Sequence, residues 1–266
     1  MFITSCKDDT VEPTPVSDAY FNTAQGSSWI FSNYLLSQDS EGEQNLGKND
    51  TLTQGANSNV LGQNAMLMKH YFVNPLSDWF SPSTANYYIY ENAAEKKVYV
   101  NSDFMKIFLP EMIQTGWNIV FNDSKWFLLA DGNAKTEWVL DSFALANVGL
   151  PVPGMEGITL NGYLKFGMKR GTDTTIAIAN ATANTYTLSI FFEGKINHPQ
   201  YPMLSTMDVR IEFLKINFYF GSKKGLLGIS APISNVTVSV PIYPSGIPLP
   251  ITFDGFDKRL IGINLK

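Results

Sequence analysis

The chain has 266 residues, 44% of them hydrophobic and 16% charged, with a net charge of −5 at pH 7. This length fits one large β domain or two small ones, and the negative charge excludes the basic footprint that nucleic-acid binding requires. A single cysteine excludes an internal disulfide, and the absence of an eighteen-residue apolar run argues against a transmembrane helix in this sequence.

The lone cysteine, Cys6, follows Ile3-Thr4-Ser5 and precedes Lys7-Asp8-Asp9. Small residues before a cysteine and a charged, flexible stretch after it resemble the lipobox of bacterial lipoproteins. In that family the signal peptide is cut before the cysteine, and the thiol carries a diacylglycerol. The resemblance implies that residues 1–5 are a signal-peptide remnant, that Cys6 carries the lipid, and that residues 6–18 form a flexible tether. The alternative is a free thiol in an N-terminal tail.

The three residues after the cysteine, Lys7, Asp8 and Asp9, are similar to the basic-then-acidic export signal of Bacteroidetes lipoproteins that are moved to the cell surface. The resemblance implies an outer-membrane protein held by its lipid and exposed at the cell surface, with the periplasmic face as the alternative. Stable anchoring takes two or more acyl chains, which this family carries.

Order is expected to begin near Tyr20, and residues 19–266 are interpreted as a single β domain. A glycine turn leads into an aromatic-rich strand that contains Trp29. Residues 37–62 are polar and predict hairpin loops with short strands between them. Three acidic residues surround Gly42 in this stretch, but they lack the spacing of a calcium loop, so a solvated turn is expected.

The middle of the chain predicts a hairpin over residues 87–100 and at most a short helix over residues 103–113, broken at Pro110. Three tryptophan-containing strands are expected next, about ten residues apart as in an antiparallel meander. They cover residues 117–120, 125–129 and 137–140.

Residues 150–154 are the best candidate for an internal boundary, where two halves of the domain would meet. After it, polar and apolar residues alternate cleanly, as in half-buried strands. The alternation slips by one residue at Phe213-Leu214, which predicts a β-bulge. Four prolines in residues 241–250 predict an edge strand or a covering loop, and a last strand is expected over residues 260–265.

The inventory of catalytic residues is thin. The two histidines, His70 and His198, are far apart in sequence and are interpreted as unrelated residues rather than metal ligands. No G-x-S-x-G elbow or phosphate-binding loop occurs. Acidic residues on or beside predicted strands form no evident catalytic pair; they are Glu137, Asp141, Glu193 and Glu212. We therefore assign no catalytic residue, metal site or cofactor, and we lean towards a protein that is not an enzyme.

Four tryptophans are the candidate ligand-facing aromatics, because large rings on a curved sheet suit a glycan or lipid site. They are Trp29, Trp117, Trp126 and Trp138. For each of them the alternative is a core residue.

The folded part loosely resembles the half-barrels of the lipoprotein-carrier (LolA/LolB-like) family, in which a concave face holds acyl chains. The resemblance lies in Tyr20-Phe21 before Gly26-Ser27-Ser28-Trp29, in Lys125-Trp126-Phe127 and Glu137-Trp138-Val139, in residues 179–190, and in Tyr219-Phe220 before Gly225-Leu226-Leu227-Gly228. The expected fold is mainly β, with a strongly curved antiparallel, half-barrel-like sheet and few short helices. A two-layer β-sandwich is the alternative.

These observations predict a non-enzymatic cell-envelope lipoprotein, attached to the membrane by its lipid. It would bind an apolar, lipid or glycan ligand, or a protein partner. A structural adhesin or fimbrial-type subunit and an envelope glycoside hydrolase are the alternatives. Nothing in the sequence indicates the oligomeric state.

Overall fold

The structure is a computed structural model, which describes residues 19–21, 23–37, 42–73, 82–108, 116–149, 157–199, 202–240 and 243–266. In these residues the chain forms fifteen strands, a short α-helix and two 3-10 helices. The predicted mainly β fold is confirmed. The elements in chain order are β1 (Ser28–Leu36), β2 (Glu43–Val60), β3 (Gln63–Val73), β4 (Pro82–Asn92), β5 (Lys97–Val100), α1 (Ser102–Ile107), β6 (Phe127–Asp131), β7 (Trp138–Gly149), β8 (Thr159–Arg170), β9 (Thr174–Ile176), η1 (Ala177–Ala179), β10 (Ala181–Asn197), η2 (Pro202–Ser205), β11 (Val209–Gly221), β12 (Gly225–Ala231), β13 (Ser234–Val240), β14 (Tyr243–Phe253) and β15 (Gly255–Asn264).

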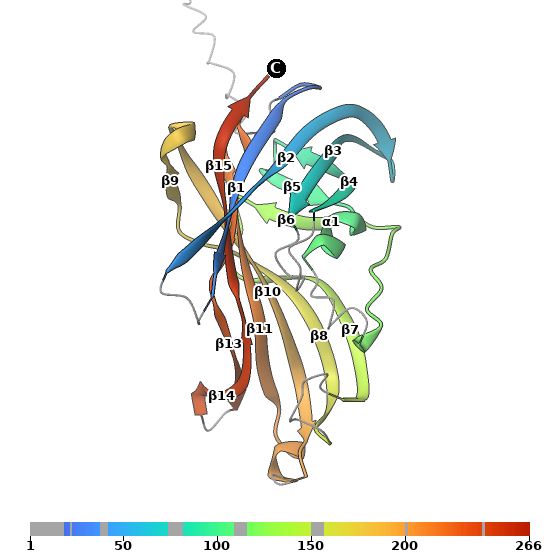
Figure 1. The fold of residues 1–266 in the computed structure, drawn as a ribbon. Coiled ribbons are helices and arrows are strands. Elements are labelled where there is room, and N and C mark those ends of the chain that lie inside the picture. The colour runs from blue at the N-terminus through green and yellow to red at the C-terminus, as the bar shows by residue number, and fades with distance from the viewer. Residues whose placement is uncertain are drawn as a thin grey trace, which may run out of the picture.

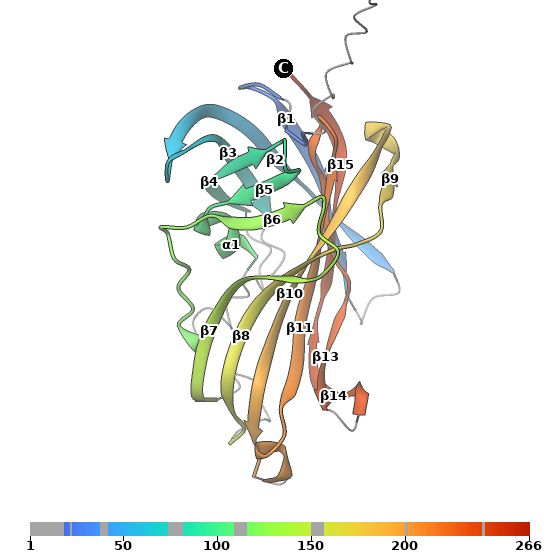
Figure 2. The ribbon, with the colours of Figure 1, turned by 180° about the vertical axis from the view of Figure 1, so that it is seen from behind.

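All strands belong to one antiparallel sheet that curls into a nearly closed barrel (Figures 1 and 2). The strand order is β6-β5-β4-β3-β2-β1-β15-β12-β11-β10-β8-β7, with β9 added to β10, and β13 and β14 added beside β11. β1 pairs with both β2 and β15, so the first and last strands lie side by side near the middle of the sheet. This arrangement confirms the strongly curved antiparallel sheet that the sequence predicts.

The two ends of the strand order, β6 and β7, are joined by hydrogen bonds from side chains to backbone carbonyls. The indole Nε1–H of Trp138 in β7 donates to the carbonyl of Leu128 in β6 at 2.8 Å. The Arg170 guanidinium at the end of β8 donates to the carbonyl of Gly132, just after β6, at 2.6 Å. We call these two bonds the seam.

The interior of the barrel is filled by aromatic and aliphatic side chains. α1 lies against this core, where Phe104 packs on Tyr87 of β4 and on Phe218 of β11, with ring centroids 5.0 and 5.6 Å apart. On the other side of the core, Phe121 packs edge-on against Phe166 of β8 at 5.0 Å. Rings that contact each other edge to face stabilise a core beyond the area they bury.

The predicted β-bulge is confirmed. Ile190 of β10 pairs with Leu214 of β11, but Phe191 pairs with Glu212, so Phe213 is the extra residue. The bulge lets both Phe213 and Leu214 be buried, although neighbours in a regular strand point to opposite faces.

Two predictions of secondary structure are wrong. Residues 37–62 do not form short hairpins, because β2 runs unbroken from Glu43 to Val60. β1 pairs with residues 43–53 of this polar strand and β3 pairs with residues 51–60, so the two partners together support its full length. Residues 117–120 are not a strand, because Trp117 lies in a helical turn and Asn118 has a positive φ of 49°. A residue in that left-handed region interrupts an extended strand.

The hairpin over residues 87–100 is confirmed as β4 and β5, and the proline-rich strand β14 pairs with β13. Residues 1–18, which include Cys6, Lys7, Asp8 and Asp9, lie outside the described residues, as does the candidate boundary at 150–154. Within the described ranges, no helix has the length and apolar character needed to cross a bilayer.

Candidate functional site

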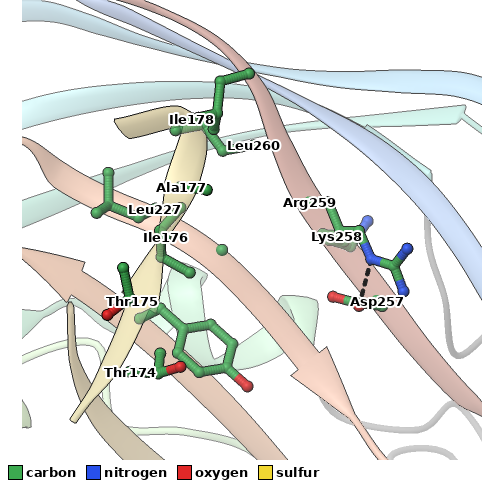
Figure 3. A pocket seen from close by; sticks show the side chains of 12 residues that line it. Thr174, Thr175, Ile176, Ala177, Ile178, Leu227, Asp257, Lys258, Arg259 and Leu260 are labelled. Carbon is green, nitrogen blue, oxygen red and sulfur yellow. Dashed lines mark hydrogen bonds and ion pairs between the residues drawn. The ribbon is translucent and has the colours of Figure 1, made fainter. Parts of the chain in front are cut away.

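A pocket of roughly 400 Å³ lies on the outer surface of the barrel, between the β9–η1 segment and the sheet beneath it. We call it the outer pocket. Its walls come from β9 and η1 on one side, from β11 and β12 below, and from β15 on the other side (Figure 3). The lining residues are Thr174, Thr175, Ile176, Ala177, Ile178, Tyr219, Leu227, Gly228, Asp257, Lys258, Arg259 and Leu260.

The floor of the outer pocket results from a second bulge. Tyr219 pairs with Gly228 and Phe220 pairs with Leu226, so Leu227 is the extra residue in β12. The side chains of Leu227 and of Ile176 in β9 both line the pocket, and both are labelled in Figure 3. A Cβ at Gly228 would lie 3.2 Å from the Tyr219 ring, which shows how closely that ring approaches the β12 backbone.

Hydroxyl and amide groups continue from the outer pocket along the sheet. Tyr219 Oη and Ser230 Oγ are 2.8 Å apart and share a hydrogen bond. Asn217 Nδ2 donates to the same Ser230 oxygen at 3.5 Å, and Thr187 Oγ1 donates to Asn217 Oδ1 at 2.7 Å. On the opposite wall, Thr174 and Thr175 add two more hydroxyl-bearing side chains. The pocket therefore combines aliphatic and aromatic surface with groups that can both donate and accept hydrogen bonds.

The charged residues at the rim are held by one another. Arg259 Nε donates to Asp257 Oδ2 at 2.7 Å, and its two terminal nitrogens donate to the two carboxylate oxygens of Glu43 in β2. Its guanidinium also lies over the Tyr34 ring, 4.3 Å from the centroid. The hydrogen bonds from Arg259 hold the pKa of Glu43 below its usual value. The two carboxylates therefore occupy the guanidinium of Arg259, and this side chain is not available to bind an anionic ligand.

The β9–η1 segment is attached to the barrel at its C-terminal end. The Lys224 ammonium group donates to the carbonyls of Ala179 and Asn180. Asn180 adopts a left-handed conformation with φ 43° that turns the chain into β10. These contacts fix the distance between the β9 wall and the floor of the outer pocket.

A second polar constellation lies inside the barrel, and we call it the buried lysine cluster: Asn33, Asp50, His70 and Lys258. The exposed fractions are 0% for Asp50, 2% for Lys258 and 3% each for Asn33 and His70. Lys258 Nζ donates to Asp50 Oδ2 at 2.6 Å, to Asn33 Oδ1 at 2.8 Å and to the Val73 carbonyl at 2.9 Å. All three protons of the ammonium group therefore have acceptors.

The carboxylate of this cluster is held just as fully. Asp50 Oδ1 accepts from Asn33 Nδ2 at 2.7 Å and from the Val73 amide at 2.9 Å. Burial acts to raise the pKa of Asp50, but the neighbouring His70 and the charge of Lys258 outweigh it, so the pKa lies below its usual value. Burial lowers the pKa of Lys258 against the opposing effect of Asp50.

His70 contacts the cluster more loosely. Its Nε2 is 3.6 Å from Asp50 Oδ2, beyond hydrogen-bond distance, and its ring packs against Phe72 and Tyr87. Burial lowers the pKa of His70, which favours the neutral ring. Among the described residues, no group of three or more histidine, cysteine, aspartate or glutamate side chains is arranged to hold a metal ion.

The acidic residues that the sequence singles out lie on the outer surface. Glu137, Glu193 and Glu212 converge on Arg210, with oxygen–nitrogen distances of 3.5, 3.0 and 3.3 Å. Arg210 covers the Phe191 ring at 3.6 Å. Asp141 pairs separately with Lys125 at 2.8 Å. Each of these carboxylates therefore has a cationic partner.

The four tryptophans lie at separate places. Trp29 is fully buried and its Nε1 donates to the Lys224 carbonyl at 2.6 Å; Trp117 is 7% exposed and donates to the Gly149 carbonyl at 3.1 Å. Trp138 is half-buried at the seam. Trp126 is half-buried beside Tyr90, with ring centroids 6.0 Å apart. None of the four lines the outer pocket.

Sequence reasoning missed both the outer pocket and the buried lysine cluster. For the cluster a signal was present, because Lys258 stands between Phe256 and Leu260 in a strand where alternate residues face the core. Both neighbours are buried, as the alternation predicts. The outer pocket left no comparable signal, since it depends on how β9 folds over β12.

No protein-family model matches the chain, and no curated protein matches it. Among solved structures, the chain is similar to a protein of Parabacteroides distasonis ATCC 8503 described as a "putative lipoprotein". The two share 8% sequence identity over 92% of this chain and 98% of the other, with a TM-score of 0.42. At this identity and TM-score the likeness is loose, and it identifies no site in the chain.

Proposed function

We propose that the chain is a non-enzymatic lipoprotein of the bacterial cell envelope whose folded part binds a neutral saccharide in the outer pocket. The observation that carries the proposal is the composition of that pocket. Tyr219 and the aliphatic side chains of the β9–η1 segment offer apolar surface, the threonine hydroxyls offer hydrogen bonds, and the rim charges are already paired.

A neutral saccharide fits this composition for a physical reason. A sugar ring presents C–H faces, which pack on aromatic and aliphatic side chains, and hydroxyls, which need donors and acceptors. Binding sites generally combine apolar lining with a few polar groups that fix orientation. A phosphate or carboxylate ligand would instead require Arg259 to give up its bonds to Glu43 and Asp257.

The structure offers less support for carrying an acyl chain. A carrier of the half-barrel type needs an apolar space against the concave face of the sheet. Here that face is packed with rings from α1 and the long strands, such as Phe104 of α1 against Phe218 of β11 with centroids 5.6 Å apart. A glycoside hydrolase is also less well supported than saccharide binding. Glycoside hydrolysis uses two available carboxyl groups, whereas Asp257 at the pocket rim is hydrogen-bonded to Arg259.

Saccharide binding is tested by titrating maltohexaose, xylohexaose and mannohexaose into the protein and into Tyr219→Ala. At least one sugar is expected to bind, and the substitution should weaken it by about tenfold or more, which corresponds to about 1.4 kcal/mol. Tyr163→Ala is the matched control, because that exposed tyrosine lies on β8, away from the pocket. Binding of a fluorescent fatty acid but of none of the sugars would overturn the proposal.

The envelope location rests on Cys6 and its neighbours and has a separate test. In the native cell, the protein should incorporate labelled fatty acid and sediment with outer membranes. Cys6→Ser should abolish the label and release the protein, because the thiol is the attachment atom. Replacing Lys7, Asp8 and Asp9 with alanine should leave the lipid in place and reduce surface accessibility to added protease. Membrane retention of Cys6→Ser would contradict the anchor.

A further inference from the structure

The buried lysine cluster places an amine, a side-chain amide and a carboxyl group in contact. Asn33 in β1 and Lys258 in β15 are directly opposite each other in the register of the two strands. Opposite residues in an antiparallel pair bring their Cβ atoms within about 5 Å, and here Lys258 Nζ is 2.8 Å from Asn33 Oδ1. We propose that Lys258 and Asn33 become joined by an amide bond between their side chains, in a reaction that Asp50 promotes.

The position of Asp50 is the main argument. One of its oxygens, Oδ2, is 2.6 Å from the Lys258 nitrogen, and the other, Oδ1, is 2.7 Å from the Asn33 amide nitrogen. A single carboxyl group therefore contacts the nitrogen that would attack and the nitrogen that would leave. This is the placement that a general acid–base group needs, because hydrogen-bond distance to both proton-exchanging atoms is the first requirement.

The surroundings also favour the reaction. Each of the three side chains is at least 97% buried. Phe31 of β1 and Phe256 of β15 are buried two positions from Asn33 and Lys258, and Phe72 is buried on β3, which pairs with β2. Exclusion of water favours a neutral amine, which is the nucleophilic form. It also strengthens hydrogen bonds to the developing charge on the carbonyl oxygen.

The reaction balances without any further reagent. The Lys258 ammonium group gives a proton to Asp50 Oδ2, and the free amine attacks the Asn33 side-chain carbon to form a tetrahedral adduct. Asp50 then passes a proton to the former amide nitrogen, which leaves as ammonia. The C–N bond to that nitrogen breaks as the adduct collapses, the bond to Lys258 Nζ that formed in the attack remains as the new amide bond, and the second amine proton passes to the Asp50 carboxylate.

Asp50 itself is the competing acceptor for the amine. Attack on its carboxyl carbon would release water and would require Asp50 to keep the proton that it takes from Lys258. Passing that proton to the Asn33 nitrogen returns Asp50 to a carboxylate, which is a poorer electrophile than an amide. Its Oδ1 also accepts two hydrogen bonds, from Asn33 and from the Val73 amide, that hold it in the anionic form. The geometry therefore favours Asn33 as the acceptor and Asp50 as the promoter.

The proposal is tested by digesting the folded, purified full-length protein with trypsin and measuring peptide masses. A Lys258 in amide linkage resists cleavage, so residues 8–48 should appear joined to residues 225–259, with a mass about 17 Da below the sum of the two peptides, the mass of ammonia. Peptides 8–48 and 225–258 recovered separately from the native protein would overturn the proposal, without recourse to any variant. A joined product between Lys258 and Asp50 would also overturn it.

Two variants separate the roles of the residues. Asp50→Asn retains a side chain of the same shape but removes the proton acceptor, and we expect unjoined peptides in the soluble, folded variant. Lys258→Met removes the nucleophile and must give the same result. Glu91→Gln, which alters a half-buried carboxyl outside the cluster, is the control and should leave the joined peptide in full yield. Joined peptides in Asp50→Asn at the wild-type yield would contradict the role of Asp50.

Discussion

At the scale of single residues, the effect of removing a buried polar atom depends on whether that atom has a hydrogen-bond partner. Trp29 and Trp126 are both tryptophans with buried indole nitrogens, but they sit in opposite situations. Trp29 Nε1 donates to the Lys224 carbonyl at 2.6 Å, whereas Trp126 Nε1 has no hydrogen-bond partner within the described part of the chain. A buried hydrogen bond that is broken on one side costs more than one that was never made.

Trp29→Phe should therefore destabilise the protein far more than Trp126→Phe. The first change leaves the Lys224 carbonyl without its donor and opens a cavity in the core, for a loss of about 2–4 kcal/mol in the free energy of unfolding. The second removes an unsatisfied donor from a half-buried ring and should cost about 1 kcal/mol or less. Urea unfolding of the two variants measures the difference. Equal losses would mean that ring volume alone decides the effect.

The Glu193 carboxylate gives a pH dependence that can be worked out. Burial acts to raise its pKa, but Lys165 at 2.5 Å and Arg210 at 3.0 Å outweigh it, so the folded-state pKa lies below its usual value. The folded state then binds fewer protons than the unfolded state near this pH. The stability that Glu193 contributes is present above about pH 4.5 and is lost as the pH falls through the folded-state pKa.

Glu193→Gln should consequently be less stable than the wild type at pH 7, by at most about 1 kcal/mol because the cluster is partly exposed. The difference should shrink between pH 5 and about pH 3 and should also shrink in 1 M salt, which screens exposed charges. Chemical denaturation at several pH values checks this. A difference that stays constant with pH would contradict the ion pairing.

At the scale of elements, β9 and η1 form a wall whose position depends on one lysine. Lys224→Met removes the donor to the Ala179 and Asn180 carbonyls and should release this segment without unfolding the barrel. Loss of about 1 kcal/mol locally would speed amide hydrogen exchange in residues 174–183 by about fivefold. Lys223→Met is the neighbouring control, because that side chain is exposed. Unchanged exchange in Lys224→Met would contradict the role of the lysine.

Elements with strong alternation could be predicted from the sequence, and polar or irregular ones could not. The Phe213 bulge was predictable because the apolar pattern changes phase within one strand. β2 was missed because its length is set by its neighbours, β1 and β3, rather than by its own polar residues. The buried lysine cluster required the register between β1 and β15, which are more than two hundred residues apart in the chain, and local patterns do not contain that information.

At the scale of the whole molecule, the sheet encloses its core without pairing its two end strands as a regular ladder. The order begins at β6 and finishes at β7, and the seam bonds of Trp138 and Arg170 connect them. Side-chain bonds to single carbonyls stabilise less than a ladder of backbone bonds, so β6 should be the first part of the barrel to open.

The seam can be tested by combining Trp138→Phe with Arg170→Met. Losing both donors should lower the local stability of β6 by about 1–2 kcal/mol, which speeds amide exchange there by a factor of about 5–30. Exchange in β11 should not change, because that strand is paired on both sides and is separated from the end strand β7 by β10 and β8. Val139→Ala, at an exposed position next to Trp138, is the control. If β6 exchanges at the wild-type rate in the double variant, the packing of Phe127 and Leu129 into the core, rather than the two seam bonds, must hold the barrel closed.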